Sequence, residues 1–364
     1  MKAEAPQRLL FFADASSVHT RRWVGEMAAR GHRCTVVTRL AGDVAGADEV
    51  IVLRPGHGKL GWFLELPRVR TLARKLRPDW VHGHYITSYG LWAAACRLPG
   101  APWRIALTAW GSDILVTPRE PGLSGALMRR IVGWSLPRAD LITADSQDVL
   151  DEIASYPGVR APRHLILWGA DTDRFMPAAQ TPAGFDVVSL RSWEPNYNID
   201  VILQAFATFA AARPQAGARL HLLGGGPLEA RLRQQAADLG IAAQVLFHGR
   251  VGDAAMVEAI QGSRVSVSIP TSDATSVSVL ESMACGLPVI ASDLPANRAW
   301  VGEAGGALVA PRDAAGVTAA LTALHDDPPR AAHIGAHNRE RVEREGSRRG
   351  QMDRMSALLA KEAA

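Results

Sequence analysis

The chain has 364 residues, of which 48% are hydrophobic and 21% charged, and its formal net charge is +4. This composition excludes an intrinsically disordered chain, and the length suits two globular domains that each bury a core. No apolar run reaches the roughly 18 to 20 residues of a membrane-spanning helix, and the opening "MKAEAPQRLLFFADASS" does not resemble a secretory signal.

Charge and cysteine content bear on partners and compartment. Basic residues exceed acidic residues in the front half, and the reverse holds in the back half. A basic front half suits anionic lipids or phosphorylated substrates, whereas no helix-turn-helix, RNA-binding signature or zinc finger indicates nucleic acid. The cysteines Cys34, Cys96 and Cys285 are odd in number, far apart and without metal-ligand spacing. We therefore expect a reducing, cytoplasmic location.

In the front half, apolar and β-branched runs alternate with helical patterns. The expected strands are "RLLFFAD", "RCTVVTR", "EVIVLR", "DWVHGH", "RIALTAW" and "DLITADS". Helical periodicity is found between them, for example over residues 21–30 and 67–76. Short strands that are apolar on both faces and alternate with helices predict an α/β fold with a parallel sheet covered on both sides.

The back half repeats this pattern. Its expected strands are "FDVVSLR", "RLHLLGGG", "QVLFHGR", "VSVSIP", "PVIASD" and "GALVA", with helices near 200–212 and 228–239. The Pro- and Ala-rich "MPAAQTPAG" is the expected join. We predict a front domain over 1–178, a back domain over 179–345, and a last helix over 346–364 that crosses back. Two doubly wound domains of this kind place ligands in a cleft at the carboxyl ends of their strands.

Two segments of the back half have the composition of ligand-binding loops. In "LLGGGPLEARL" a strand ends, Gly224 and Gly225 begin a glycine triplet, and a helix follows. The glycines either let a phosphate approach the helix start or only form a tight turn. In "SDATSVSVLESMACGLPVIASD" hydroxyls precede a helix, with Asp273 in the loop and Glu281 inside the helix. The two acids either hold the hydroxyls of a nucleotide sugar or serve as a helix cap and a surface acid.

The second segment resembles the retaining GT-B glycosyltransferases of family 4. Their hallmark is an acid, seven residues and a glutamate that run into "AMACGLPVIA"; this chain has Asp273, seven residues, Glu281 and "SMACGLPVIA". Further segments match in the family's order: "HTRRWVGEMAARGHRCTVVT", "RPDWVHGHY", "ADLITADSQDV", "WGADTDRF" and "VLFHGRV". The resemblance implies a GT-B fold of two Rossmann-like domains whose parallel sheets face a central cleft.

The resemblance also implies site residues. Glu281 would hold the ribose, Asp273 the transferred sugar and Arg191 the diphosphate. The other donor-binding positions implied by the family are Thr275, Ser276, Val277, Gly224, Gly225, Arg250, Val251 and Tyr197, with the backbone around Arg250 and Val251 facing the base. Attack from the front face, with the leaving phosphate oxygen taking the acceptor proton, would require neither a protein base nor a metal ion, and no cofactor is expected.

The chain departs from the family at two positions. Tyr197 stands where the family usually has a lysine, so a hydroxyl would replace one cation at the diphosphate. Trp110 stands where many members have a histidine, and its N–H can only donate. Asp113 in the same segment would bind the acceptor, orient the loop or cap a helix. His19 and His84, after two front-half strands, would either meet the substrate or be structural.

The acceptor is the least defined part of the implied reaction. The segment "GKLGWFLELPRVRTLARKLR" mixes aromatic and basic residues, and "GALMRRIVGWSLPR" resembles it. These segments either lie against an anionic membrane or are ordinary amphipathic helices packed on a sheet.

The function predicted is transfer of a sugar from a nucleoside diphosphate sugar to a glycan, lipid-linked or small-molecule hydroxyl, in polysaccharide, glycolipid or cell-envelope synthesis. The expected location is the cytoplasm, with peripheral contact at the inner face of the membrane as an open possibility. Two alternatives remain: a nucleotide-sugar 2-epimerase of the same fold, and a non-catalytic nucleotide-sugar-binding subunit.

Overall fold

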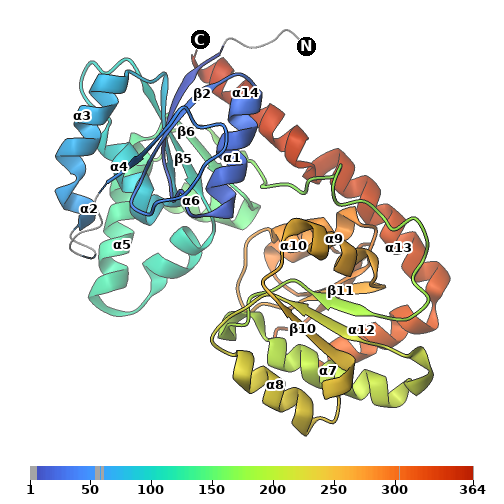
Figure 1. Cartoon of the computed structure of the whole chain (residues 1–364). Coiled ribbons are helices and arrows are strands. Elements are labelled where there is room, and N and C mark those ends of the chain that lie inside the picture. The colour runs from blue at the N-terminus through green and yellow to red at the C-terminus, as the bar shows by residue number, and fades with distance from the viewer. Residues whose placement is uncertain (1–5, 54–57, 59–60, 303, 364) are drawn as a thin grey trace. The chain divides into compact units, whose positions relative to one another are not determined.

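The computed structural model describes residues 6–53, 58, 61–302 and 304–363, which form two compact units (Figure 1). The front unit consists of Met1–Trp168 with Arg349–Ala364, and the rear unit of Gly169–Arg348. The chain thus enters the rear unit at Gly169, ahead of the Pro- and Ala-rich segment 176–184, and leaves it within the last helix.

The front unit contains a sheet of seven parallel strands in the order β3-β2-β1-β4-β5-β6-β7. The strands are β1 (Arg8–Phe12), β2 (Arg33–Thr38), β3 (Glu49–Val52), β4 (Trp80–His84), β5 (Arg104–Ala109), β6 (Leu141–Ala144) and β7 (Arg163–Leu165). Sequence patterning predicted all of these except β7, whose three residues "RHL" are too short and too polar to indicate a strand. β7 pairs with β6 and extends the sheet by one edge strand.

Helices cover both faces of the front sheet. They are α1 (Val18–Ala29), α2 (Gly61–Leu64), α3 (Leu66–Leu76), α4 (Gly90–Ala95), α5 (Gly122–Ser135), α6 (Gln147–Ser155) and α14 (Arg348–Ala363). Trp23 of α1 and Met355 of α14 share one buried cluster with Phe11 of β1. The indole N–H of Trp80 also donates to the carbonyl oxygen of Leu359 at 3.1 Å. The last helix therefore completes the core of the front unit.

The rear unit repeats the same topology with six parallel strands in the order β10-β9-β8-β11-β12-β13. The strands are β8 (Val187–Ser189), β9 (Leu220–Leu223), β10 (Val245–Gly249), β11 (Val265–Ser268), β12 (Val289–Ser292) and β13 (Gly306–Val309). Both sheets begin in the middle, extend to one edge and then continue on the other side. This order is the doubly wound arrangement of Rossmann-like folds, as the sequence predicted.

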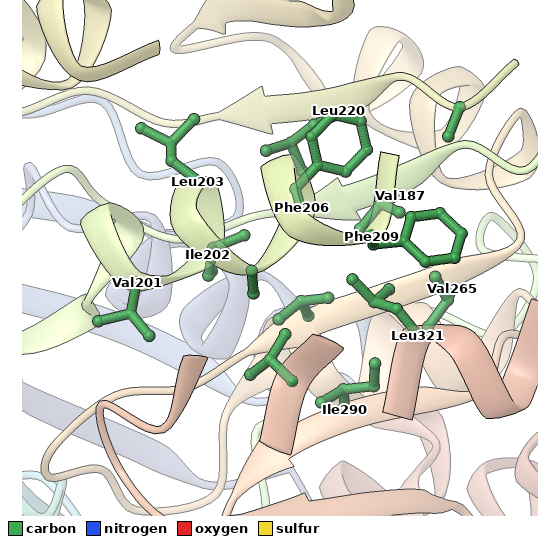
Figure 2. Close-up of a cluster of buried hydrophobic side chains, with 14 of the residues drawn as sticks. Val187, Val201, Ile202, Leu203, Phe206, Phe209, Leu220, Val265, Ile290 and Leu321 are labelled. Carbon is green, nitrogen blue, oxygen red and sulfur yellow. The ribbon is translucent and has the colours of Figure 1, made fainter. Parts of the chain in front are cut away.

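The rear core lies between the sheet and the helices on one of its faces. The helices of this unit are α7 (Ile199–Ala212), α8 (Glu229–Asp238), α9 (Asp253–Gln261), α10 (Val277–Ala284), α11 (Pro295–Trp300), α12 (Ala314–Asp326) and α13 (Pro328–Arg341). Figure 2 shows Phe206 and Phe209 of α7 and Leu321 of α12 against Leu220 and Val265 of the strands. Each such side chain contributes about 1.5–3 kcal/mol to the stability of the folded state when it is fully buried. The core therefore stabilises the rear sheet and the starting points of the loops at its edges.

Candidate functional site

The topology of the rear sheet points to the gap between β8 and β11. These two strands are neighbours, but the chain leaves β8 toward β9 on one side and β11 toward β12 on the other. Ligands of doubly wound sheets bind at such a switch point, outside the carboxyl ends of the strands. Arg191 follows β8, and Asp273 lies in the loop between β11 and α10. Two of the predicted site residues are thus placed where a ligand is expected.

The guanidinium of Arg191 is the centre of the polar contacts at this point. Its Nη2 donates to Oδ2 of Asp273 at 2.6 Å, and its Nη1 donates to the hydroxyl oxygens of Ser276 and Ser278, the latter at 3.2 Å. The Arg191 side chain is 9% exposed, and its Nε has no hydrogen-bond partner within the described part of the chain. This leaves a buried cation with an unused donor, which suits an oxyanion.

The Asp273 carboxyl is held by opposing effects. Burial raises the pKa of Asp273 above its ordinary value, and the charge and hydrogen bond of Arg191 offset part of that rise. Its side chain bonds Arg191 rather than capping α10, whose cap residue, Ser276, makes no side-chain cap bond. The helix-cap alternative for Asp273 is therefore excluded by its contacts.

Tyr197 contacts Arg191 through the face of its ring. The guanidinium carbon of Arg191 lies 4.4 Å from the ring centroid, a cation–π contact. The sequence suggested that the Tyr197 hydroxyl would replace a lysine ammonium, whereas the structure uses the ring to support the neighbouring cation.

The residue after Tyr197 fixes that ring in place. Asn198 has a left-handed backbone, with φ +52°, which asparagine tolerates better than most residues. Its side-chain amide donates to the carbonyl of Ile269 at 2.8 Å, and its Oδ1 accepts from Arg312 at 2.9 Å. Sequence reasoning did not single out Asn198; an asparagine between a turn and a helix is the signal that could have identified it.

The loop before α10 and the first turn of this helix contain the remaining predicted donor residues. Thr275 and Val277 are half-buried on either side of Ser276, and the free backbone amides at a helix start suit an anion. Glu281 lies further along α10 and is only 4% exposed. The alternative reading of Glu281 as a surface acid is thus wrong. A buried carboxylate next to a helix start suits the hydroxyls of a ribose.

The glycine triplet packs against the loop that contains Arg191. A Cβ on Gly224 would lie 2.4 Å from the carbonyl oxygen of Arg191, and one on Gly226 would lie 2.4 Å from that of Trp193. Both distances are far below contact, so these two glycines make room for the chain's own backbone. A Cβ on Gly225 would instead meet the side chain of Arg250 at 3.2 Å. The triplet therefore positions the Arg191 loop against the end of β9.

Arg250 and Val251 follow β10, at the same edge of the sheet. Arg250 is exposed and Val251 is half-buried. The strand order β10-β9-β8-β11 places Arg250, the glycine triplet, Arg191 and Asp273 in that sequence along the carboxyl edge. One continuous edge of the rear sheet thus holds the predicted donor residues.

In the front unit, the histidines of β4 are buried. His84 is 1% exposed and His82 is also 1% exposed, and their rings lie 4.8 Å apart beside Trp23. Burial lowers the pKa of His82 to about 3, and burial together with His82 and His19 lowers the pKa of His84 well below its usual value. Both imidazoles are neutral near pH 7, so His84 fits the structural alternative. Alternation along β4 with the buried Trp80 was the signal for this burial.

His19 and Trp110 belong to the same aromatic group and are more exposed than His82 and His84. Both are half-buried, and each packs on Trp168, with ring centroids 4.1 and 4.3 Å away. Trp110 also meets Trp23 edge-on. These rings stand beyond β1, β5 and β7, at the carboxyl edge of the front sheet. Sequence reasoning missed Trp168, which lies in the matched segment "WGADTDRF".

Asp113 connects two loops of the front unit. One carboxylate oxygen accepts from the backbone N–H of Ile86 at 2.6 Å, and the other accepts from that of Trp110 at 2.9 Å. The side chain is 1% exposed, and burial raises its pKa to about 6 against the effect of these bonds. Of the three predicted roles for Asp113, its contacts support loop orientation.

Among the described residues, no group of three or more His, Cys, Asp or Glu side chains is arranged to hold a metal ion. A cavity of about 460 Å³ in the rear unit is lined by Arg264, Pro288 and Arg339, among others. Because Arg264 and Pro288 precede β11 and β12, this cavity lies at the amino edge of the sheet, away from Arg191.

Comparisons with known proteins agree with this arrangement. Residues 8–146 match the family described as "Glycosyl transferase 4-like", and residues 178–341 match "Glycosyl transferases group 1". A curated relative is the GDP-mannose-dependent monoacylated alpha-(1-6)-phosphatidylinositol monomannoside mannosyltransferase of Corynebacterium glutamicum, with 28% identity over 64% of this chain and 68% of the relative. Another is the GDP-mannose-dependent alpha-(1-6)-phosphatidylinositol monomannoside mannosyltransferase of Mycolicibacterium smegmatis, with 29% identity over 57% of this chain and 62% of the relative.

Solved structures show the same fold. Anabaena Alr3699/HepE in complex with UDP superimposes with a TM-score of 0.82 at 17% identity, over 98% of this chain and 100% of the other. The whole length of both described units is thus included in the likeness.

Proposed function

The chain belongs to glycosyltransferase family 4, the glycosyl transferases group 1, and from this premise we propose that it is a retaining, metal-independent transferase that moves a hexose from a nucleoside diphosphate to a hydroxyl acceptor. The rear unit holds the donor and the front unit the acceptor. The observation that carries this proposal is the buried guanidinium of Arg191 at the switch point, between the hydroxyls of Ser276 and Ser278 and the acid Asp273.

The rear-unit residues divide the donor between them. Arg191 and the backbone amides of 275–277 neutralise the diphosphate, because their N–H groups lie at the carboxyl edge of the rear sheet and can donate hydrogen bonds to it. Glu281 accepts from the ribose hydroxyls. Asp273 exchanges its contact with Arg191 for the hydroxyls of the transferred sugar. The two mannosyltransferase relatives are GDP-mannose-dependent, and the HepE complex contains UDP. GDP- and UDP-hexoses are therefore the first donors to test.

The reaction needs no protein base. The bond between the sugar's anomeric carbon and the β-phosphate oxygen breaks, a bond from that carbon to the acceptor oxygen forms on the same face, and the acceptor proton passes to the leaving phosphate oxygen. Arg191 and the helix amides stabilise the charge that develops on the diphosphate. The proposal assigns proton transfer to neither His84, whose pKa is lowered well below its usual value by burial, nor Trp110, whose indole N–H can only donate.

A lipid acceptor at an anionic membrane fits the front unit. The Leu64 side chain of α2 is 64% exposed and the Leu123 side chain at the start of α5 is 91% exposed. α2 and α5 both pack against α4: the indole of Trp92 donates to the carbonyl of Trp62 in α2, and α5 contacts α4 directly. Exposed apolar side chains of this size on neighbouring helices favour a partner surface.

Basic side chains accompany this apolar surface. The exposed cations are Arg68, Arg74, Lys75, Arg77, Arg129 and Arg130. No helix in the described residues is long and apolar enough to cross a bilayer. We infer peripheral contact of α2, α3 and α5 with the anionic inner face of the cytoplasmic membrane, where a phosphoinositide- or polyprenol-type acceptor would be presented. Lys59 and Leu60 of the segment "GKLGWFLELPRVRTLARKLR" lie outside the described residues.

The proposed function is tested by product analysis. The protein is incubated with UDP-, GDP-, ADP- and dTDP-linked hexoses and membrane lipid extract, with and without EDTA. We expect one donor class to give a glycosylated product with retained anomeric configuration, at the same rate in EDTA. Inverted product, a rate that requires a divalent ion, or a 2-epimerised donor with no transfer would contradict the proposal.

A further inference from the structure

The donor site lacks one positive charge that the family resemblance implies. Where the family usually places a lysine, this chain has Tyr197, whose ring lies flat on Arg191. Tyr197 stabilises the existing cation but adds no charge of its own. A nucleoside diphosphate carries two to three negative charges at neutral pH, and in a metal-independent site the protein has to neutralise them. A second cation should therefore reach the site from elsewhere in the rear unit.

Arg250 is placed to supply it. It follows β10 directly, two strands from β8 in the order β10-β9-β8. The Nε, Cγ and Cδ atoms of Arg250 lie 3.2, 3.3 and 3.7 Å from the position that a Cβ on Gly225 would occupy. Since Gly225 follows β9, the Arg250 side chain extends from its own strand across the glycine triplet, in the direction of Arg191.

The guanidinium of Arg250 is also uncommitted. It forms no hydrogen bond and no ion pair with any described residue, and it is exposed. Two other exposed arginines of the rear unit differ in this respect: Arg219 pairs with Asp186 at 2.7 Å, and Arg233 pairs with Glu229 at 2.9 Å. An arginine that folds over a glycine turn without an acidic partner is available to an anionic ligand.

We propose that the Arg250 side chain is the second cation of the donor site and contacts the diphosphate in place of the family's lysine. This inference rests on the proposed function. Adjacent strands are about 4.8 Å apart, so Arg250 starts roughly 10 Å from the Arg191 strand, and its side chain covers most of that span. Gly225 has a matching role, because a Cβ there would lie 3.2 Å from Nε of Arg250 and would crowd this side chain.

Binding measurements with paired ligands test this role. UDP, GDP, ADP and dTDP are each titrated calorimetrically against the protein, alongside the matching nucleosides, in EDTA at low salt. We expect R250Q to weaken binding of the preferred diphosphate about tenfold while leaving its nucleoside unchanged. The matched control is R231Q, because Arg231 on α8 is also exposed but does not lie over the turn. It should bind as the wild type does.

A second variant makes the test specific for charge. In the R250Q background, Y197K returns the lysine of the family and should recover most of the lost diphosphate affinity. The inference is overturned if R250Q binds the diphosphate as tightly as the wild type. It is also overturned if R250Q weakens binding of the nucleoside and of the diphosphate by the same factor, which would assign Arg250 to the base. If the wild type binds no nucleoside diphosphate at all, the proposed function fails instead.

Discussion

Arg191 and Asp273 pair directly at the carboxyl edge of the rear sheet, with Nη2 and Oδ2 2.6 Å apart. One residue follows β8 and the other follows β11, so the pair joins the two strands that border the switch point. In the proposed function a diphosphate uses the same guanidinium, so donor binding would compete with this ion pair. The acid that is released is then available to the transferred sugar.

Removal of Arg191 should abolish transfer without unfolding the protein. R191A deletes the main cation for the leaving group, and loss of one such donor typically costs about 10²- to 10³-fold in turnover. Asp273 then takes up a proton more readily, since burial already raises its pKa. Turnover and the melting temperature are measured for R191A and for R231A as the control. Near-normal turnover of R191A would show that the site is elsewhere.

Tyr197 should act through its ring and not through its hydroxyl. Y197F retains the stacking surface 4.4 Å from the Arg191 guanidinium carbon, so its kcat/KM should stay within about twofold of the wild type. Y197A removes a contact of about 0.5–2 kcal/mol and should lose roughly three- to thirtyfold. If phenylalanine is as damaging as alanine, the hydroxyl itself meets the substrate, as the sequence first suggested.

Glu281 should bind the nucleoside part of the donor. E281Q keeps the volume of this 4% exposed side chain but removes its charge. A ribose contact predicts that E281Q weakens the nucleoside and the nucleoside diphosphate by the same factor, on the order of tenfold. Calorimetry with both ligands checks this. An effect on the diphosphate alone would place Glu281 elsewhere in the site.

The front unit should become less stable in acid, because His82 is buried as a neutral imidazole. Its folded pKa is about 3, whereas an unfolded histidine takes up a proton near pH 6.5. Below pH 6.5 the unfolded state therefore binds more protons, and the free energy of unfolding falls by about 1.4 kcal/mol per pH unit from this residue, down to about pH 3. Urea unfolding at pH 7.5 and 5.5 should show this extra loss for the wild type but not for H82F.

The control for that prediction is His333, an exposed histidine of α13. H333N should follow the wild type at both pH values. Equal pH dependence in the wild type and H82F would mean that His82 takes up its proton without unfolding.

Membrane contact should depend on Leu64 and Leu123, the two most exposed leucines among the described residues of the front unit. The wild type should float with vesicles that contain phosphatidylserine at low salt, and less so at high salt. L64D and L123D should remain in the soluble fraction. Leu239, 37% exposed on the rear unit, provides the control, since L239D should float normally. Flotation that is indifferent to both front-unit variants would exclude this surface.

The fold could be predicted from the sequence because most strands of this protein have a recognisable local pattern of apolar residues. A run such as "RLLFFAD" is apolar on both faces and indicates a buried parallel strand without tertiary information. β7 was missed because its three residues, only one of them apolar, depend on pairing with β6 to become a strand.

The predictions for the site depended more on tertiary contacts. Sequence motifs selected Arg191 and Asp273, but nothing local indicates that side chains 82 residues apart pair with each other. The orientation of Tyr197 follows from the left-handed backbone of Asn198 and its bonds to distant loops. The sequence left His84 open between a substrate contact and a structural role, although the alternation of Trp80, His82 and His84 already indicated that both histidines share a buried face.

A crystal structure with a bound nucleoside diphosphate hexose tests the central claim most directly. The account predicts diphosphate oxygens within hydrogen-bonding distance of the Arg191 guanidinium and of the backbone amides of 275–277, no metal ion on the diphosphate, and Asp273 moved from Arg191 to the sugar. Diphosphate density at another edge of either sheet, with Arg191 still bonded to Asp273, would contradict it.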